Sequence, residues 1–146
     1  YPVVNVMTVL EDGSYHEVDS SDMAFQICGR NCFKETFLKA KPVLLEPVMK
    51  LEAEVPPDFQ GPVTGELTSR RGIISSTDMA GDTAVIIAEV PQAETFGYST
   101  DLRSMTQGQG TFSMEFSHYR QVPGNIQEKI LADRKAEKEK QMVGSK

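Results

Sequence analysis

The residues of this chain best suited to metal or redox chemistry are two cysteines, Cys28 and Cys32. Their spacing on an expected helix places the two Cβ atoms about 5–6 Å apart, too far for an unstrained disulfide. A structural metal site needs about four ligands, and the two histidines, His16 and His118, are isolated. We therefore expect no metal site, and we interpret both cysteines as small buried apolar side chains in a reducing cytosol.

Motifs for nucleotide binding and catalysis are missing. The sequence contains no Gly-x-x-x-x-Gly-Lys-Ser/Thr phosphate loop, no Gly-x-Gly-x-x-Gly after a strand and no Ser/His/Asp signature. Gly108-Gln109-Gly110 is interpreted as a turn before a strand. Carboxylates are plentiful, but none is distinguished as an acid/base pair. We predict no catalytic residue, cofactor or metal in this piece of chain.

The segment of residues 96–110 places Gly97 inside an expected helix of residues 92–105. A glycine there costs about 1 kcal/mol relative to alanine, and its neighbours Tyr98, Ser99 and Thr100 are mediocre helix formers. Two explanations remain open. These residues could allow the helix to pack closely on a sheet, or they could form a surface that accommodates a large partner.

Net charge is −6 and unevenly spread. Residues 1–123 carry nine Lys/Arg against seventeen Asp/Glu, whereas residues 124–146 carry six against four. Generic nucleic-acid binding rests on many phosphate-neutralising cations. Any RNA contact of this chain must therefore be local and dependent on shape.

The first forty residues predict two strands and a helix. Apolar side chains alternate over residues 3–10, which indicates a strand, and residues 15–18 are expected to return as its partner. Asp12-Gly13 between them favours a tight turn. Ser20-Ser21-Asp22 then opens a helix that runs to about Ala40. The side chains expected to contact a core from this helix are Ala24, Ile27, Cys28 and Phe37.

These forty residues are too few to bury a core of their own. The chain also begins within an expected strand and without an initiator Met. We therefore expect a fragment of a longer protein, with a partner segment upstream.

An internal repeat of thirty-five residues organises the rest of the chain. Ala53-Glu54-Val55-Pro56 recurs letter for letter as Ala88-Glu89-Val90-Pro91. An acid, a leucine and a serine follow each copy at the same spacing: Glu66, Leu67 and Ser69, then Asp101, Leu102 and Ser104. This period fits one strand–helix–strand unit, so two copies predict a ferredoxin-like β-α-β-β-α-β domain.

The fold class predicted is α+β. A ferredoxin-like β-α-β-β-α-β sandwich at residues 41–122 follows a partial α+β domain at residues 1–40 and precedes a charged C-terminal helix or tail at residues 123–146. Pro47 predicts an edge strand or a bulge, and Gly72 is expected to stop the first helix of the repeat. Residues 135–141 have no apolar stripe and are expected to fray or to be disordered.

Several motifs resemble those of bacterial elongation factor G, a translational GTPase, and they occur in the family's order. Residues 96–110 resemble the family's C-terminal signature. The other matching pieces are Asp12-Gly13-Ser14-Tyr15-His16, Val18-Asp19-Ser20-Ser21 with Met23-Ala24-Phe25, Leu45-Glu46-Pro47, Ser69-Arg70-Arg71-Gly72 and Phe116-Ser117-His118-Tyr119. The resemblance covers the chain to about Glu128.

The resemblance implies that residues 1–40 are the second half of domain IV, a ribosomal-protein-like α+β domain, and that the ferredoxin-like part is domain V. It also implies that GTP and Mg²⁺ are bound by a missing N-terminal domain of the parent. This fragment alone should neither bind nor hydrolyse GTP.

Site residues follow from the same resemblance. Asp12, Gly13, Ser14 and His16 resemble a loop at the tip of domain IV, which in the family enters the decoding region beside the A-site tRNA. Arg70 and Arg71 resemble contacts of domain V with ribosomal RNA and neighbouring proteins. For this pair, ordinary solvated cations at a helix end are the alternative. Arg103 is a weaker candidate, because it could instead bridge to Asp101 or Glu94, or contact another domain of the parent.

The function implied is a ribosome-binding part of a cytoplasmic translocation factor, with the ribosome, tRNA, mRNA and the parent's other domains as partners and no membrane. Two alternatives stay open. One is a paralogue that acts in ribosome recycling or ribosomal protection. The other is a regulatory ferredoxin-like module that binds a small ligand or pairs with itself.

Overall fold

The computed structural model describes residues 1–143. It divides into two compact units, Tyr1–Pro42 and Val43–Lys146. The second unit contains the sheet and the hydrophobic core, and the first contains a single helix.

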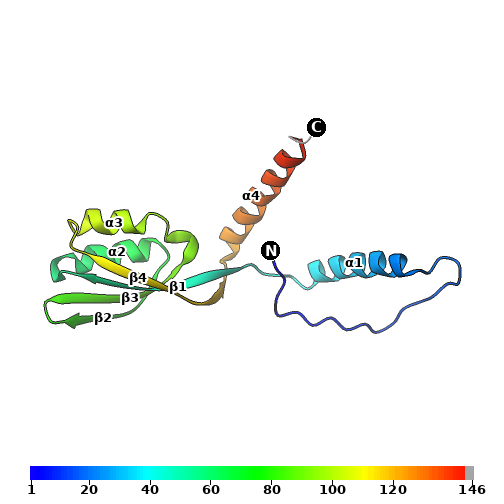
Figure 1. Ribbon diagram of the computed structural model, residues 1–146, viewed down its shortest axis with the longest axis horizontal. Coiled ribbons are helices and arrows are strands. Elements are labelled where there is room, and N and C mark those ends of the chain that lie inside the picture. The colour runs from blue at the N-terminus through cyan, green and yellow to red at the C-terminus, as the bar shows by residue number, and fades with distance from the viewer. Residues whose placement is uncertain (144–146) are drawn as a thin grey trace. The chain divides into compact units, whose positions relative to one another are not determined.

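The second unit is a four-stranded antiparallel sheet with two helices on one face (Figure 1). Its elements alternate in the order β1 (Leu45–Val55), α2 (Gln60–Ser69), β2 (Ile73–Ala80), β3 (Thr83–Pro91), α3 (Tyr98–Met105) and β4 (Thr111–Gln121). The strand order β2-β3-β1-β4 places the first strand of each repeat at the centre of the sheet. This topology confirms the predicted ferredoxin-like β-α-β-β-α-β fold.

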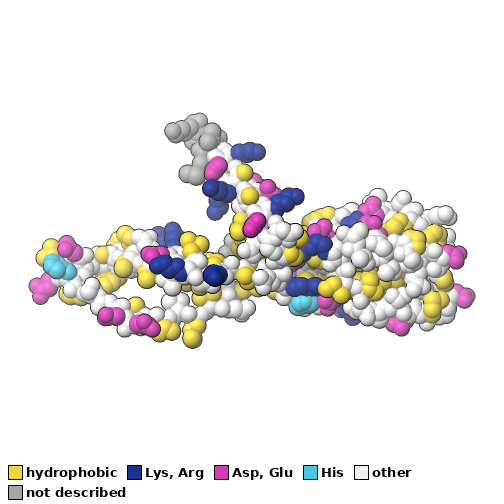
Figure 2. Space-filling view, turned by 180° about the vertical axis from the view of Figure 1, so that it is seen from behind, with side chains coloured by type: hydrophobic (Ala, Val, Ile, Leu, Met, Phe, Trp, Pro, Cys, Tyr) yellow, Lys and Arg dark blue, Asp and Glu magenta, His cyan; other side chains and the backbone are white. Residues whose placement is uncertain are grey.

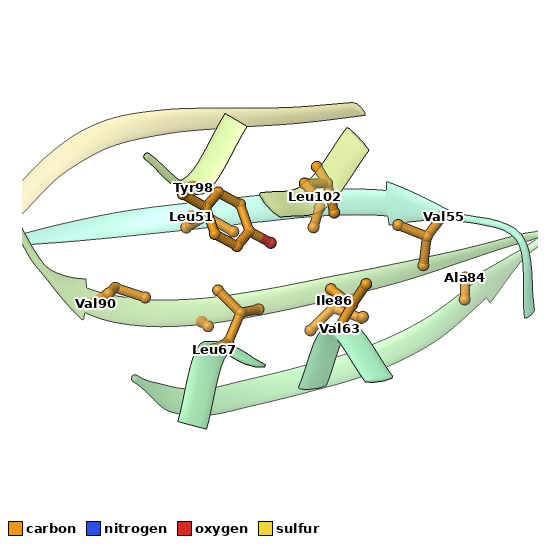
Figure 3. Close-up of a cluster of buried hydrophobic side chains, with 11 residues drawn as sticks. Leu51, Val55, Val63, Leu67, Ala84, Ile86, Val90, Tyr98 and Leu102 are labelled. Carbon is orange, nitrogen blue, oxygen red and sulfur yellow. The ribbon is translucent and has the colours of Figure 1, made fainter. Parts of the chain in front are cut away.

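The two repeats form quasi-equivalent halves. In the central ladder Glu52 pairs with Ile87, the residue thirty-five positions later, so a local twofold axis passes between β1 and β3. The core is duplicated as well, because α2 and α3 each point two buried side chains at the strands (Figure 3). Residues one period apart form the buried pairs Leu51 and Ile86, Val63 and Tyr98, and Leu67 and Leu102.

The first helix of the repeat ends in a hydrogen-bonded motif. At the end of α2 the Gly72 N–H donates to the Leu67 carbonyl at 2.9 Å and the Arg71 N–H donates to the Thr68 carbonyl at 3.1 Å, which is a Schellman motif. The helix stops where predicted, but Arg71 holds the left-handed conformation, with φ 60°. Gly72 is needed for a different reason, since a Cβ there would lie 2.4 Å from the Leu67 carbonyl oxygen.

The predicted helix over residues 92–105 is wrong in its first half. A 3-10 turn, η2 (Gln92–Glu94), is followed by a break, and α3 begins only at Tyr98. Gly97 lies at the break as the residue preceding the helix, with φ 76°. An added Cβ would meet nothing within 4 Å, so Gly97 is not required for close packing. It is required because this conformation is unfavourable for residues with a side chain.

Pro47 lies beside a β-bulge. A bulge was one of the two alternatives predicted from this proline, the other being an edge strand. The pairing of β1 with β4 shifts register between Val48 and Met49, and the pairing of β1 with β3 starts only at Val48. Pro47 therefore lies in an interior strand, paired with Tyr119 of β4 but outside the ladder with β3, so its missing N–H costs no bond to β3.

The first unit contains one helix, α1 (Asp22–Lys39), and its start is confirmed: the Ser21 side chain accepts from the Ala24 N–H. The predicted strands at residues 3–10 and 15–18 are wrong, because this segment forms no strand and Asp12-Gly13 forms no turn. The alternating pattern is present, but these residues pair with nothing within the unit. An isolated two-stranded hairpin is marginal in water at best.

The predicted core contacts of α1 are also wrong as a group. None of its residues is buried; Ala24 and Phe37 are half-buried, whereas Ile27 is exposed. Cys28 and Cys32 are free and exposed, contrary to their interpretation as buried side chains. No described element of the unit covers the helix, so its apolar side chains remain in water.

The helix α4 (Gly124–Val143) follows the sheet. Its base is fixed to the sheet unit, because the Leu44 N–H donates to Gln127 Oε1 at 2.9 Å and Ile126 and Ile130 are half-buried. The expectation that residues 135–141 fray is wrong: they continue the helix, and Arg134 and Glu137 form an exposed ion pair at 3.6 Å. The last three residues of the predicted tail lie outside the described part. Within that part, no helix has the length and apolar character needed to cross a membrane.

Candidate functional site

The predicted tip residues of the first unit lie in an exposed segment without regular secondary structure. The carboxylate of Asp12 accepts a hydrogen bond from the Gly13 N–H, at 2.7 Å to Oδ1. Ser14 is exposed and lies two residues before His16. The four predicted contact residues are thus neighbours in an accessible stretch of chain, although no hairpin presents them.

His16 is held by a small polar turn at the start of α1. Its N–H donates to Ser20 Oγ at 2.7 Å, and its carbonyl accepts the Ser20 N–H at 3.0 Å. Its ring Nδ1 accepts the Val18 N–H at 3.3 Å. The same Nδ1 also lies 3.5 Å from Asp19 Oδ2, so a peptide N–H and a carboxylate both face this side of the ring. With 69% of the side chain exposed, the other ring nitrogen, Nε2, remains open to a hydrogen-bond partner.

Arg70 is not solvated; its side chain is 15% exposed and bonds within the second unit. Nε donates to Glu66 Oε1 at 2.7 Å, and Nη2 forms an ion pair with Asp101. Nη1 donates to the Glu94 and Phe96 carbonyls at 2.7 and 3.0 Å. The repeated acids Glu66 and Asp101 therefore converge on one guanidinium, which leaves Arg70 little capacity for an external phosphate.

Arg71 is likewise engaged, since both of its terminal nitrogens contact Glu46, and Nη1 also lies 3.4 Å from Glu94 Oε1. Glu46 is 9% exposed, so this pair fixes the end of α2 to the start of β1. Burial lowers the pKa of Arg71, but bonding to Glu46 and Glu94 outweighs burial and raises it overall. The view of Arg70 and Arg71 as solvated cations is therefore wrong.

Arg103 occupies the exposed face of α3. The expected bridges to Asp101 or Glu94 do not form, because those carboxylates pair with Arg70 and Arg71. Among the described residues Arg103 makes no ion pair. Of the three predicted arginines, it is the one whose guanidinium remains available to a partner.

The surface offers little else for small-molecule chemistry. Within residues 1–143 no three His, Cys, Asp or Glu side chains are placed to hold a metal ion. Two hollows of the second unit measure about 220 and 290 Å³. The first is lined by Lys50, Glu52, Ser113, Met114 and Glu115, and the second by Glu54, Val55, Pro56, Asp82, Thr83, Gln109 and Thr111. On the face seen in Figure 2 the Lys and Arg side chains do not gather into one continuous stripe. The described surface therefore favours contacts with a large partner over a buried ligand.

Sequence reasoning identified the arginines but not their partners. Glu66 and Asp101 could have been linked to Arg70 through the repeat, because the local twofold relates their positions. Glu46 gave no comparable signal, since it reaches Arg71 only through the pairing of distant segments. Phe96 carries the carbonyl that Arg70 binds and is 80% exposed; the sequence placed it in the 96–110 segment but gave it no role.

Comparison with protein families divides the chain where the structure does. A family described as "Elongation factor G, domain IV" matches residues 1–41, and one described as "Elongation factor G C-terminus" matches residues 43–130. The second match alone covers more than half of the chain.

Curated relatives agree with these matches. An elongation factor G of Rhodopirellula baltica is 60% identical over 135 residues, which cover 92% of this chain and 19% of that protein. An elongation factor G of Aquifex pyrophilus is 57% identical over 138 residues, 94% of this chain and 20% of that protein. The chain thus spans about a fifth of the length of the curated relatives it matches.

A crystal structure of a Thermus thermophilus protein resembles this chain with a TM-score of 0.72. The two are 43% identical, and the similarity covers 86% of this chain and 19% of that one.

Proposed function

Because the chain belongs to the elongation factor G family, we propose that it is a ribosome-docking part of a translational GTPase. The observation that carries the proposal is the unbroken order of the two matches, domain IV followed by the C-terminus, over residues 1–41 and 43–130. The parent uses GTP-dependent rearrangement to move tRNA and mRNA. This part supplies surfaces that fit the ribosome and does no bond-making.

The His16 turn supports contact with RNA in the decoding region. An exposed imidazole whose ring is oriented through Nδ1 can hydrogen-bond through Nε2 to backbone groups and 2′-hydroxyls of RNA. Asp12, Gly13 and Ser14 add small polar groups beside it. In this proposal they approach the A-site tRNA.

The second unit supports a contact with ribosomal RNA through Arg103, whose side chain is free on the exposed face of α3. Arg70 and Arg71 contribute indirectly: their intramolecular bonds hold the end of α2 and the loop before α3 in place. GTP and Mg²⁺ are bound by another part of the parent, which works in the cytoplasm.

Co-sedimentation of the 146-residue chain with purified 70S ribosomes at graded salt tests the proposal. We expect binding that weakens as salt rises, and no GTP hydrolysis by the chain above background. Arg103→Gln should weaken binding about fivefold, the equivalent of about 1 kcal/mol. Lys138→Gln, which removes one positive charge from exposed α4, is the matched control and should bind as the wild type does.

Two results would contradict the proposed docking to the ribosome. One is the absence of ribosome binding at low salt. The other is ligand-dependent dimerisation without ribosome binding, which would favour the regulatory module. GTP hydrolysis that persists through rigorous purification would contradict the assignment of nucleotide chemistry to another part of the parent.

A further inference from the structure

Phe96 is an apolar side chain held out into solvent. It is 80% exposed, more than the other exposed large apolar side chains described in the second unit. Single exposed apolar residues are common and mean nothing by themselves. Phe96 differs because three separate features of the structure fix the loop that carries it.

The first feature is Arg70, which donates from Nη1 to the carbonyls of Glu94 and of Phe96 itself. The second is the turn before it, where the Thr95 N–H and Oγ1 both donate to the Gln92 carbonyl, at 3.1 and 2.8 Å. These bonds hold the backbone on both sides of the ring. A side chain displayed on a fixed loop loses less conformational entropy on docking than one on a flexible loop.

The third feature is Gly97, whose left-handed conformation reverses the chain between Phe96 and α3. Tyr98 then points into the core, where it is 1% exposed, its ring packs edge-on against Phe112 and the Arg70 guanidinium lies 5.5 Å from its centre. Tyr98 thus secures the start of the helix from inside. Since an added Cβ at Gly97 would meet nothing within 4 Å, open space remains beside the backbone that follows Phe96.

Charge around the loop indicates the class of partner. Two guanidinium groups, Arg70 and Arg71, are surrounded by four carboxylates, and two of the latter are substantially exposed: Asp101 at 49% and Glu94 at 39%. The cluster is therefore net negative. A nucleobase stacked on Phe96 would bring phosphates toward these carboxylates, whereas a protein pocket bordered by Lys or Arg would complement them.

We propose that Phe96 is an anchor that inserts into an apolar, basic-rimmed pocket of a ribosomal protein, and that Arg70 is the positioning residue that holds it there. This inference rests on the proposed docking to the ribosome. It assigns different partners to the loop before α3 and to the helix itself, with Phe96 in the loop contacting protein and Arg103 on the helix contacting RNA.

Binding to purified 70S ribosomes tests the anchor directly. Phe96→Ala should reduce affinity by about tenfold or more, as for a central interface side chain, while Phe96→Leu should retain most of it. Neither variant should unfold the domain, because the side chain lies in solvent. If the wild type binds and Phe96→Ala binds equally well, the inference fails and the docking proposal stands. If the wild type does not bind, the docking proposal itself fails.

Photo-crosslinking identifies the partner. The variant Phe96→p-benzoylphenylalanine, irradiated on 70S ribosomes, should give an adduct with a ribosomal protein that mass spectrometry identifies. An adduct with ribosomal RNA only, or no adduct from a chain that binds, would overturn the choice of a protein pocket. An equivalent photoreactive residue at exposed Met79 on strand β2 is the control for random proximity.

A double-mutant cycle separates positioning from general stability. Arg70→Lys keeps the charge but cannot reach all four acceptors, so it should weaken ribosome binding in the wild-type background. In the Phe96→Ala background the same change should have no further effect, because Arg70 acts through Phe96. Equal losses in both backgrounds would show that Arg70 contributes only to folding. Should Arg70→Lys fail to fold, Phe96→Ala and the crosslink decide the proposal.

Discussion

At the scale of single residues, a buried tyrosine illustrates how a duplicated core departs from symmetry. Tyr98 occupies the position that Val63 occupies in the first half, and its larger ring fills the space between α3 and the strands (Figure 3). Its hydroxyl is buried without a hydrogen-bond partner among the described residues. An unsatisfied buried hydroxyl costs about 1–3 kcal/mol. The ring therefore stabilises the core while its oxygen opposes that effect.

Replacing Tyr98 with Phe removes the oxygen and keeps the ring. We expect the free energy of unfolding at pH 7 to stay unchanged or to rise by about 1 kcal/mol, as measured by urea denaturation. A fall of more than about 1 kcal/mol would indicate that the hydroxyl has a stabilising partner. Tyr98→Ala is the control for the ring itself and should cost about 3–5 kcal/mol.

The same substitution changes the response to alkali. Burial raises the pKa of Tyr98 to about 12, from an ordinary value of 10.0. The neutral ring is favoured in the folded state, so its contribution is complete below pH 10 and is lost as the pH rises toward 12, in total roughly 2–3 kcal/mol. Tyr98→Phe should lose correspondingly less stability between pH 10 and pH 12. Parallel pH profiles for the two proteins would contradict the assignment.

His16 is the residue whose change should separate RNA contact from nucleotide chemistry. In the full-length parent we expect His16→Ala to slow translocation about tenfold, the equivalent of one lost hydrogen bond of about 1.4 kcal/mol. Ribosome-stimulated GTP hydrolysis should be spared. His16→Gln, which can present an N–H at a similar reach, should restore part of the rate. Unchanged translocation in His16→Ala would remove this residue from the proposed contact.

At the scale of elements, α2 and the turn that follows it show why glycines of one segment differ in their roles. Gly61 and Gly65 lie within α2, where an added Cβ would meet nothing within 4 Å. Gly72, three residues beyond the helix, lies against the Leu67 carbonyl and the Val90 side chain. Identical residues thus stand in open space within the helix and in tight contact beyond its end.

Two glycine-to-alanine variants test this difference by urea denaturation. Gly65→Ala should raise the free energy of unfolding by about 0.5–1 kcal/mol, since alanine favours the helix and nothing obstructs its methyl group. Gly72→Ala should lower it by about 2–3 kcal/mol, because its Cβ would overlap a backbone oxygen. Effects of the same sign would contradict this account of the helix end.

At the scale of the whole molecule, stability is concentrated in one of the two units. Among the described residues every fully buried apolar side chain lies between Val48 and Val122, in the ferredoxin-like unit and the turn after it. In the first unit α1 has no buried residue. Burial of apolar surface is the main favourable term in folding. The cooperative unfolding transition should therefore belong to the second unit.

Removing residues 1–42 tests this concentration. The remaining chain should keep a cooperative thermal transition, with a Tm within about 4 °C of the full chain, the shift that about 1 kcal/mol produces in a domain of this size. Far-ultraviolet circular dichroism should lose the contribution of α1. A large fall in Tm, or loss of cooperativity, would show that the first unit stabilises the second.

Much of the fold followed from local and periodic patterns. The thirty-five-residue repeat determined the order of strands and helices and the equivalence of the halves, because identical spacings impose identical strand–helix–strand units. The family could likewise be read from short motifs in order. The order of the elements and the family of the chain could both be inferred from the spacing of residues along the sequence.

Only the tertiary structure showed what Arg70 and Arg71 contact and that Phe96 is exposed. A guanidinium bonds to whatever acceptors the fold brings near it, and Arg70 meets Asp101 and the carbonyls before α3 only after two helices have packed on one sheet. The strands expected at residues 3–10 and 15–18 failed for a related reason: a strand exists through its hydrogen-bonded neighbour, and alternation in one segment does not supply that neighbour. Sequence spacing sets the order of the elements, whereas long-range contacts set the role of each side chain.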